Sequence, residues 1–329
     1  MGSAVAIHLA NNGHQVKLWG TKWDKEIIDD MKERKISKAL DVKIPNNISF
    51  FYHNELEEAL QGTKLIIIAV ISKGMESISN NIANYITENH MILSVTKGID
   101  ENNLITMSEV IKNSLPEDLK NRIAIVKLGG PIIAKEFANG AYTEGVFGSE
   151  NLESAKYVRD QFKNNKFKGN ISKDSIGVDL CAAFKNSYAI AMGMIESVEK
   201  NKDNPAAALM ARGAVEMANI IGAYGGSMET ALGIAGVGDY YVTAQGGRNG
   251  QFGKLLGQGY SKKEALEIME NTTVEGITVT LNGYKLLQKL EAQGKINIKR
   301  DTPLFLEIYK VLYEGQSVNQ AIQDYWASE

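Results

Sequence analysis

Short apolar runs alternate with helix-length segments through residues 1–172 of the chain. The strongest run, KLIIIAVI at residues 64–71, is apolar after its first residue, as in a parallel strand that is covered on both faces. A helical pattern at residues 75–86 and another apolar run at residues 91–96 follow it. Because this alternation is typical of a doubly wound parallel sheet, we expect an α/β fold whose ligands bind at the carboxyl ends of the strands.

The same pattern sets the expected order of elements. We expect strands at residues 15–19, 48–52, 64–71, 91–96, 123–128, 143–148 and 168–171. We expect helices at residues 3–12, 24–34, 55–60, 75–86, 105–114, 132–139 and 152–164. Past residue 174 the strand patterns stop, and amphipathic helices run to the end. We therefore predict a dinucleotide-binding domain over residues 1–172, truncated at its N-terminus, and an all-helical substrate and catalytic domain over residues 173–329.

The start of the chain carries only part of a dinucleotide-binding fingerprint. That fingerprint needs a strand, then GxGxxG, then a helix whose N-terminus holds the pyrophosphate. The helix is present and Gly2 stands where the third glycine belongs, but no strand or further glycine precedes Met1. Either the sequence is truncated or its cofactor site is incomplete. We expect truncation, since the missing piece would be a central strand of the sheet.

The end of the second expected strand bears on the choice of cofactor. An acidic side chain there binds the ribose 2′-hydroxyl of NAD, whereas a basic one accommodates the 2′-phosphate of NADP. The strand runs into Gly20, Thr21 and Lys22, and the first carboxylate is Asp24. This pattern favours NADP over NAD, with a solvated lysine in a turn as the open alternative.

A buried helix is predicted at residues 177–195, GVDLCAAFKNSYAIAMGMI. Its only charged residues are Asp179 and Lys185, and small or apolar residues share the side of Lys185 at helical spacing. An ammonium on such a side is costly to bury unless it meets a partner, a cleft or a substrate anion. The alternative is a lysine whose stem lies in the core while its ammonium reaches water.

Two further stretches end in residues suited to anionic ligands. SVTKGID at residues 94–100 places Lys97 directly after a strand, where a solvated lysine is the alternative. In GIAGVGDYYVTAQGGRNGQFG at residues 233–253, Thr243 lies one helical turn after Asp239. The double glycine lets Arg248 and Asn249 project from a sharp bend, and a guanidinium beside an amide is suited to a phosphate.

Composition excludes several classes of protein. The 36 basic and 39 acidic residues are mixed along the chain and give a net charge of -3, which does not suit nucleic acid or an anionic membrane as a partner. A single cysteine excludes an internal disulfide framework and suits a reducing compartment. The four histidines lack metal-ligand spacing, and no basic leader or membrane span is predicted. We expect a cytoplasmic protein without a metal site.

In these stretches the chain resembles the NAD(P)-dependent glycerol-3-phosphate dehydrogenases. The resemblance covers essentially all 329 residues, through the motifs SVTKGID, GGPIIAKEFANG, AAFKNSYAIAMG, GVGDYYVTAQGGRNGQFG and TTVEGITV. It implies a Rossmann-like doubly wound sheet, here without its first strand, and a helical C-terminal domain. It also implies reversible hydride transfer between NAD(P)H and dihydroxyacetone phosphate, giving sn-glycerol 3-phosphate for glycerophospholipids. The family suggests a homodimer formed through the helical half.

The resemblance also implies roles for individual residues. Lys185 matches the general acid and base at the C2 oxygen of the substrate, and Lys97 and Asp239 match the rest of the catalytic set. The implied substrate contacts are Lys97, Lys185, Asn186, Asp239, Thr243, Gly247, Arg248 and Asn249. The implied cofactor contacts are Met1, Gly2, Lys22, Lys97, Gly130, Ile132, Ala134, Arg248 and Glu275. One departure is GGP at residues 129–131, where many members have SGP.

These roles predict a tuned electrostatic site. Burial and the neighbouring Lys97 should lower the pKa of Lys185 towards neutrality, and Asp239 should partly oppose that shift. Two alternatives stay open at this point. A ketopantoate reductase-like or other hydroxy-acid dehydrogenase shares the two-domain plan, and Arg248 could then bind a carboxylate. A non-catalytic metabolite-binding relative would explain the incomplete glycine loop.

Overall fold

The computed structural model describes residues 1–201 and 203–328, which form two compact units. Unit 1 comprises Met1–Thr96, Ser108–Leu128 and Ile132–Ser175. Unit 2 comprises Lys97–Met107, Gly129–Pro131 and Ile176–Glu329. The predicted domain boundary at residue 172 stays a prediction, and each unit is described below by itself.

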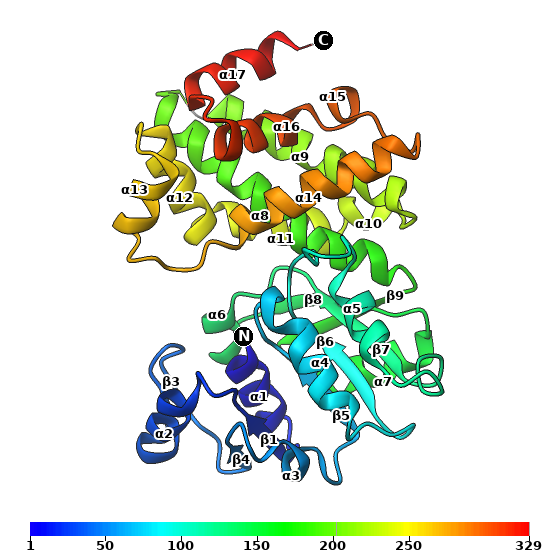
Figure 1. Cartoon of the computed structure of the whole chain (residues 1–329). Coiled ribbons are helices and arrows are strands. Elements are labelled where there is room, and N and C mark those ends of the chain that lie inside the picture. Colours follow the sequence, from blue (N-terminus) through cyan, green and yellow to red (C-terminus); the bar gives the residue numbers. More distant parts are fainter. Residues whose placement is uncertain (202, 329) are drawn as a thin grey trace. The chain divides into compact units, whose positions relative to one another are not determined.

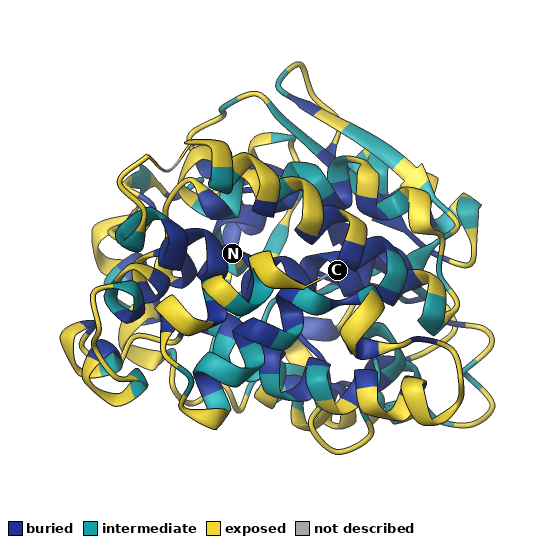
Figure 2. Ribbon diagram, turned by 90° about the horizontal axis from the view of Figure 1, so that it is seen from above, coloured by how far each residue is buried: buried dark blue, intermediate teal, exposed yellow. Residues whose placement is uncertain are grey.

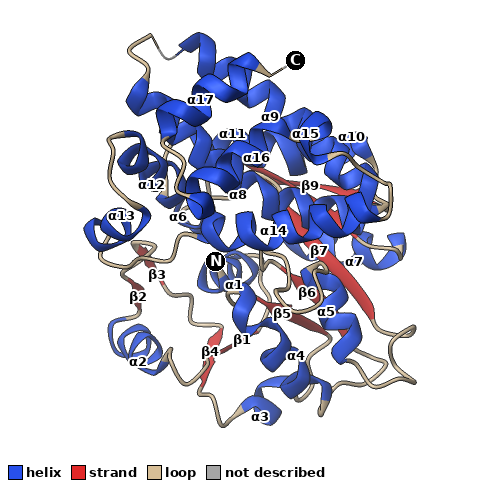
Figure 3. Cartoon of the chain, turned by 45° about the horizontal axis from the view of Figure 1, so that its top comes forward, coloured by secondary structure: helices blue, strands red, loops and turns tan. Residues whose placement is uncertain are grey.

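Unit 1 is Rossmann-like, as the sequence predicts. Its main sheet has the strand order β5-β6-β7-β8-β9, and a separate parallel pair joins β1 to β4. The pairings β5 with β6, β6 with β7 and β8 with β9 are parallel. The strands of these two sheets, red in Figure 3, are β1 (Val16–Trp19), β4 (Ile48–Phe51), β5 (Leu65–Ile68), β6 (Met91–Ser94), β7 (Ala124–Gly129), β8 (Thr143–Gly148) and β9 (Phe167–Ser172).

The helices of unit 1 supply much of its core. They are α1 (Gly2–Asn11), α2 (Lys25–Arg34), α3 (Leu56–Leu60), α4 (Met75–Ala83), α5 (Met107–Ser114), α6 (Ala134–Ala138) and α7 (Leu152–Phe162), with the short turn η1 (Ser72–Gly74). Apolar residues of α1, α6 and α7 pack in one buried cluster with residues of the sheet. Within that cluster the His8 ring stacks on Phe137, with ring centroids 4.3 Å apart, and its Nε2 donates to the Phe162 carbonyl at 2.7 Å.

A small hairpin in unit 1 is absent from the predicted elements. It pairs β2 (Ile36–Ser37) antiparallel with β3 (Val42–Lys43). Two residues per strand are too few to show alternation of polar and apolar side chains, so the sequence pattern cannot reveal them. The turn uses a left-handed backbone at Asp41, with φ of 58°.

Unit 2 is built from helices, again as predicted (Figure 1). They are α8 (Ser175–Val198), α9 (Asp203–Tyr224), α10 (Met228–Leu232), η2 (Ile234–Gly238), α11 (Asp239–Ala244), α12 (Arg248–Gly257), α13 (Lys262–Ile268), α14 (Glu275–Ala292), α15 (Ile298–Asp301), α16 (Pro303–Tyr309), η3 (Lys310–Glu314) and α17 (Val318–Ala327). Figure 2 shows buried residues in dark blue on the inner faces of helices and exposed residues in yellow outside. No helix among the described residues is long and apolar enough to cross a lipid bilayer.

Helix α8 is the buried helix predicted from the sequence, and every residue from Gly177 to Ile195 is buried. Glycines let α12 approach it closely. A Cβ on Gly193 would lie 2.0 Å from the Gly250 carbonyl oxygen, and a Cβ on Gly253 would lie 2.0 Å from the Ile190 carbonyl oxygen. Any larger side chain at these two glycines would therefore push α12 away from α8.

A buried carboxylate joins three helices of unit 2. Glu216 of α9 accepts hydrogen bonds from the backbone amides of Leu304 at 2.8 Å and Phe305 at 2.9 Å, which open α16. It also accepts from the Tyr188 hydroxyl of α8 at 3.1 Å. Burial raises the pKa of Glu216 to about 7, although these hydrogen bonds oppose the shift. The side chain thus caps a helix that lies 88 residues further along the chain.

Candidate functional site

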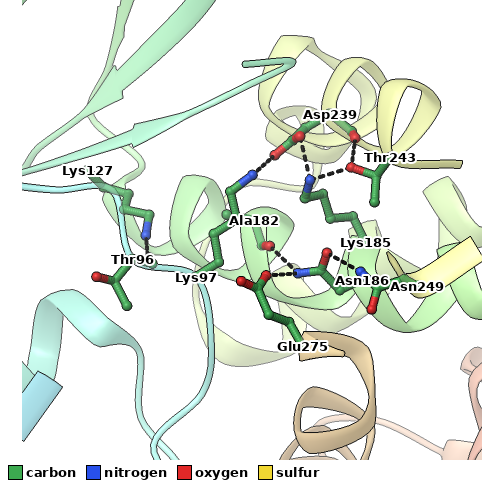
Figure 4. A network of polar contacts seen from close by, with 10 residues as sticks. All are labelled: Thr96, Lys97, Lys127, Ala182, Lys185, Asn186, Asp239, Thr243, Asn249 and Glu275. Atoms are coloured by element: carbon green, nitrogen blue, oxygen red, sulfur yellow. Dashed lines mark hydrogen bonds and ion pairs between the residues drawn. The ribbon is translucent and has the colours of Figure 1, made fainter. Parts of the chain in front are cut away.

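The centre of the site is a carboxylate that bridges two ammonium groups, all within unit 2 (Figure 4). Asp239 Oδ1 lies 2.5 Å from Lys185 Nζ, and Asp239 Oδ2 lies 3.1 Å from Lys97 Nζ. The side chains of Lys185 and Asp239 are 4% and 2% exposed. A buried ion pair of this kind needs close geometry on both sides to offset the loss of hydration. The structure therefore brings together the three residues for which the family resemblance implies a catalytic role, and that role stays a prediction.

Local structure explains how these groups meet. Asp239 begins α11, and Thr243 donates its hydroxyl to the Asp239 carbonyl at 2.7 Å, one turn further on. Lys185 Nζ also donates to Thr243 Oγ1. The predicted spacing of Asp239 and Thr243 is thus confirmed as one helical turn. It presents a carboxylate and a hydroxyl to the same ammonium.

The two lysines respond differently to the shared carboxylate. Burial lowers the pKa of Lys185 to about 7, attraction to Asp239 opposes this shift, and repulsion from Lys97 adds to it. Burial is the largest single effect on Lys97 and acts to lower its pKa, but attraction to Asp239 and Glu275 and hydrogen bonding to Lys185 and Asp239 together outweigh it and leave that pKa raised. At neutral pH Lys97 therefore stays charged. Lys185 is the group that can release and regain a proton.

A second polar chain lies beside the lysines (Figure 4). Asn186 Nδ2 donates to the Ala182 carbonyl at 3.2 Å and reaches Glu275 Oε2 at 3.4 Å. Asn249 Nδ2 donates to Asn186 Oδ1 at 2.9 Å, and the Gly276 amide donates to Asn249 Oδ1 at 2.9 Å. Both asparagine side chains are therefore oriented by protein partners. The predicted use of Asn249 at a substrate phosphate stays a prediction.

Arg248 provides the accessible positive charge of the site. It opens α12 directly after Gly247, whose φ of 114° is a left-handed backbone that glycine adopts without strain. Its side chain is 51% exposed and lies 3.8 Å from Glu275 Oε1. A guanidinium beside the first amides of a ten-residue helix suits an anion.

The remaining predicted cofactor residues are spread over the chain. Met1 and Gly2 stand at the start of α1, Lys22 follows β1, and Ala134 opens α6. Ile132 is buried, and Gly130 has a φ of 119° in the turn after β7. Except for Gly130 these residues belong to unit 1. Their role in binding a cofactor stays a prediction.

Sequence reasoning missed a residue that holds the segment after Lys97. Asn282 of α14 is buried and donates to the Ile99 carbonyl at 3.0 Å. A buried asparagine on an amphipathic helix is a detectable signal, but its partner lies 183 residues away. Among the described residues, no three His, Cys, Asp or Glu side chains gather as metal ligands.

Comparison with known proteins gives matches over nearly the whole length of the chain. The sequence model of the NAD-dependent glycerol-3-phosphate dehydrogenase N-terminus matches residues 1–155, and that of the C-terminus matches residues 174–323. An NADP(+)-dependent glycerol-3-phosphate dehydrogenase of Archaeoglobus fulgidus is 34% identical, over 98% of this chain and 95% of that relative.

Solved structures agree. A glycerol-3-phosphate dehydrogenase from Coxiella burnetii superposes with a TM-score of 0.86 at 28% identity, over 99% of this chain and 97% of that one. A ketopantoate reductase from Ralstonia eutropha superposes with a TM-score of only 0.57 at 13% identity, over 99% and 97% of the two chains. That second likeness concerns the fold alone.

Proposed function

We propose that this chain, which belongs to the NAD-dependent glycerol-3-phosphate dehydrogenase family, interconverts dihydroxyacetone phosphate and sn-glycerol 3-phosphate with NAD(P). The observation that carries the proposal is the buried Lys185 ammonium, paired with Asp239 at 2.5 Å and with a pKa lowered to about 7. Such a group exchanges a proton readily at neutral pH, as reduction of a ketone to an alcohol requires.

Lys185 would serve the oxygen on C2 of the substrate. When bound, a nicotinamide cofactor would supply the hydride that reduces C2, and the Lys185 ammonium would give its proton to the C2 oxygen. In the oxidation the neutral amine takes that proton back. Thr243 and Asp239 hold the Lys185 amine in place, since both accept hydrogen bonds from it. This orientation removes part of the entropy cost of proton transfer.

Lys97 would act as a fixed positive charge. Its raised pKa keeps it protonated throughout the cycle. A preorganised ammonium stabilises the negative charge that develops on the C2 oxygen, and it does so more strongly in a site shielded from water. Asp239 keeps Lys97 and Lys185 near each other despite their repulsion, since it contacts both.

The substrate phosphate would bind at Arg248 and the first turn of α12. Arg248 now pairs with Glu275 at 3.8 Å, and a bound phosphate would take the place of Glu275 as the anion that contacts Arg248. The α8 and α12 helices touch through Gly193 and Gly253, which fixes the Arg248 end of α12 relative to Lys185. Binding energy gained at the remote phosphate can then orient the three-carbon body for reaction.

The residues of unit 1 fit a dinucleotide. The first turn of α1 carries no acidic side chain, and Met1 supplies no side-chain cap, so its amides suit a pyrophosphate. At the end of β1, the Asp24 carboxylate accepts the Thr21 amide at 2.8 Å and the Thr21 hydroxyl at 2.6 Å. Lys22 lies over the Trp23 ring, 4.8 Å from its centroid. A carboxylate engaged in the turn and a lysine beside it favour NADP over NAD.

The wider setting follows the same assignment. Residues 1–172 would bind the dinucleotide and residues 173–329 the phosphorylated three-carbon substrate. The protein would act in the cytoplasm, as a single buried cysteine suits a reducing compartment. It would act as a homodimer through its helical half and supply sn-glycerol 3-phosphate for glycerophospholipids.

The test is a rate measurement on the purified chain with dihydroxyacetone phosphate or ketopantoate, each with NADPH and NADH. We expect oxidation of NADPH with dihydroxyacetone phosphate only, and loss of more than about 99% of that rate in Lys185→Met. Lys168→Met is the matched control, because Lys168 is exposed on β9 and pairs with Glu144 at 3.0 Å. A rate with ketopantoate alone would favour a hydroxy-acid dehydrogenase. Absence of NADPH binding in a titration would favour a non-catalytic relative.

A further inference from the structure

Besides Lys185, Lys127 is a buried lysine, and it lies near the carboxyl end of strand β7 in unit 1. Lys127 is 0% exposed and stands in β7 among the apolar residues Ile125, Val126 and Leu128. A buried ammonium is costly unless hydrogen bonds replace its hydration. Lys127 Nζ donates to the main-chain carbonyl of Thr96 (Figure 4). None of the roles assigned above uses this charge.

Strand pairing explains why Lys127 reaches that carbonyl. β6 and β7 are parallel neighbours, and Lys127 is in register with Ser94. Thr96 lies two residues beyond Ser94, so a long side chain directed along the strand can reach it. Thr96 is itself buried and is held on its other side, since its hydroxyl donates to the Val70 carbonyl at 2.9 Å.

The residue after Thr96 is Lys97. A peptide group is planar, so the Thr96 carbonyl and the Lys97 amide share one plane, and fixing the carbonyl fixes the direction in which Lys97 leaves the strand. The next residue, Gly98, has a φ of 151° and would not hold that direction by itself. The segment is anchored again at Ile99, by Asn282 at 3.0 Å.

We propose that Lys127 is a positioning residue for Lys97, through a charge-assisted hydrogen bond that sets the Thr96–Lys97 peptide in the orientation from which Lys97 reaches Asp239. This inference rests on the proposed function for its readout, because it concerns the lysine pair of that site. Lys127 itself touches no substrate in this scheme. It acts on the reaction through Lys97.

Loss of the hydrogen bond from Lys127 to the Thr96 carbonyl should change the electrostatics of the site in a specific way. Lys185 is faced by Asp239 and Thr243 of α11 and by Lys97, and Lys97 is also attracted to Glu275 of α14. When Lys97 moves from Asp239, its repulsion of the Lys185 ammonium weakens and Asp239 is left to Lys185 alone. Both changes raise the pKa of Lys185. Lys185 must be protonated to act as the acid, so the pH above which reduction fails moves up.

The experiment compares the pH dependence of kcat/KM for dihydroxyacetone phosphate reduction in the full chain and in Lys127→Met. We expect the alkaline limb to move up by about one pH unit, and kcat to fall about tenfold with little change in KM. Val126→Ala is the matched control, because it creates a cavity in the same strand and leaves the Thr96 carbonyl paired. It should lower stability without moving the limb.

A double-variant comparison gives the decisive result. In a Lys97→Met background the Lys127→Met change should move the limb no further, since the group that it positions is gone. Methionine replaces the buried charge at similar volume, so the variant should fold. Should it not fold, Lys127→Gln takes its place with the same expected direction.

The outcomes separate this inference from the proposed function. Without any reduction of dihydroxyacetone phosphate by the unaltered chain, the proposed function fails. With normal activity in that chain, an unmoved limb in a folded Lys127 variant overturns the positioning role. If Lys127→Met shifts the alkaline limb equally in the wild type and in the Lys97→Met background, the positioning role is overturned as well.

Discussion

Removal of the Asp239 charge is the sharpest perturbation of the candidate site. Asp239→Asn keeps the shape of the side chain and its ability to accept one hydrogen bond from Lys185. It removes the only carboxylate that contacts both lysines at 2.5 Å and 3.1 Å among the described residues. The substitution therefore isolates the charge of Asp239 from its role in packing.

Coulomb's law gives the order of magnitude of the effect for two charged groups in contact. Opposite unit charges about 4 Å apart attract by roughly 4 kcal/mol at the effective dielectric constant of about 20 that suits protein sites. That energy corresponds to about three pKa units, and the remaining amide dipole of asparagine recovers some of it. We expect the pKa of Lys185 to fall by about two units from its value of about 7.

The sign of the rate change follows from the role of Lys185 as the acid in reduction. The active form is the ammonium, so a lower pKa moves the alkaline limb of kcat/KM to lower pH. At pH values above the wild-type limb, kcat/KM should then be lower by roughly 100-fold. The rate should recover as the medium is made more acidic.

The assay is the initial rate of NADPH oxidation with dihydroxyacetone phosphate from about pH 4 to about pH 9, a range that brackets both pKa values. Asp29→Asn is the matched control, because Asp29 also accepts from a lysine at 2.8 Å and a tyrosine at 2.6 Å, but in unit 1. It should leave the limb in place. A limb in Asp239→Asn at or above the wild-type position would refute the assignment of Asp239 as the counter-ion of Lys185.

Three further predictions address the phosphate, the cofactor and a buried carboxylate. Arg248→Ala should raise the KM for dihydroxyacetone phosphate by about 10- to 100-fold in steady-state kinetics, and an unchanged KM would remove Arg248 from the phosphate site. Lys22→Ala should raise the KM for NADPH by about tenfold and leave that for NADH alone; equal changes would argue against a 2′-phosphate contact. Glu216 has a folded-state pKa raised from 4.5 to about 7, so it stabilises the fold below pH 4.5 and loses that contribution as the pH rises through about 7. Urea titrations should show the unfolding free energy of the wild type, relative to Glu216→Gln, falling by about 3 kcal/mol over this range, whereas a constant difference would contradict the raised pKa.

Much of the fold was predictable because its signals are local. Strands β5, β6 and β7 are mostly apolar short runs between helical patterns, and α8 carries small or apolar residues on every side, so the burial of these elements follows from the sequence. The hairpin of β2 and β3 was not predictable, since its two-residue strands carry no periodic signal.

In the candidate site, too, contacts between residues close in the sequence were predictable and contacts between distant residues were not. Residues one helical turn apart, such as Asp239 and Thr243, meet because the helix itself brings them together, and the sequence predicts their contact. The buried side-chain amide of Asn249 forms hydrogen bonds with Asn186 and Gly276, which lie 63 and 27 residues away in the sequence. No local sequence pattern predicts these partners. The sequence predicted a ligand role for Asn249, and the structure adds a structural one.

The sequence by itself determined that an α/β half precedes a helical half and that a lysine stands among small and apolar residues on α8, but it left open whether the ammonium is buried or reaches water. Only the tertiary structure decided that one carboxylate serves both Lys97 and Lys185, which lie 142 and 54 residues from Asp239. The periodic spacing of apolar residues in the sequence predicts which side chains are buried. Which of them meet depends on how closely helices such as α8 and α12 pack and where strand ends such as Thr96 are held. These are properties of the folded chain as a whole.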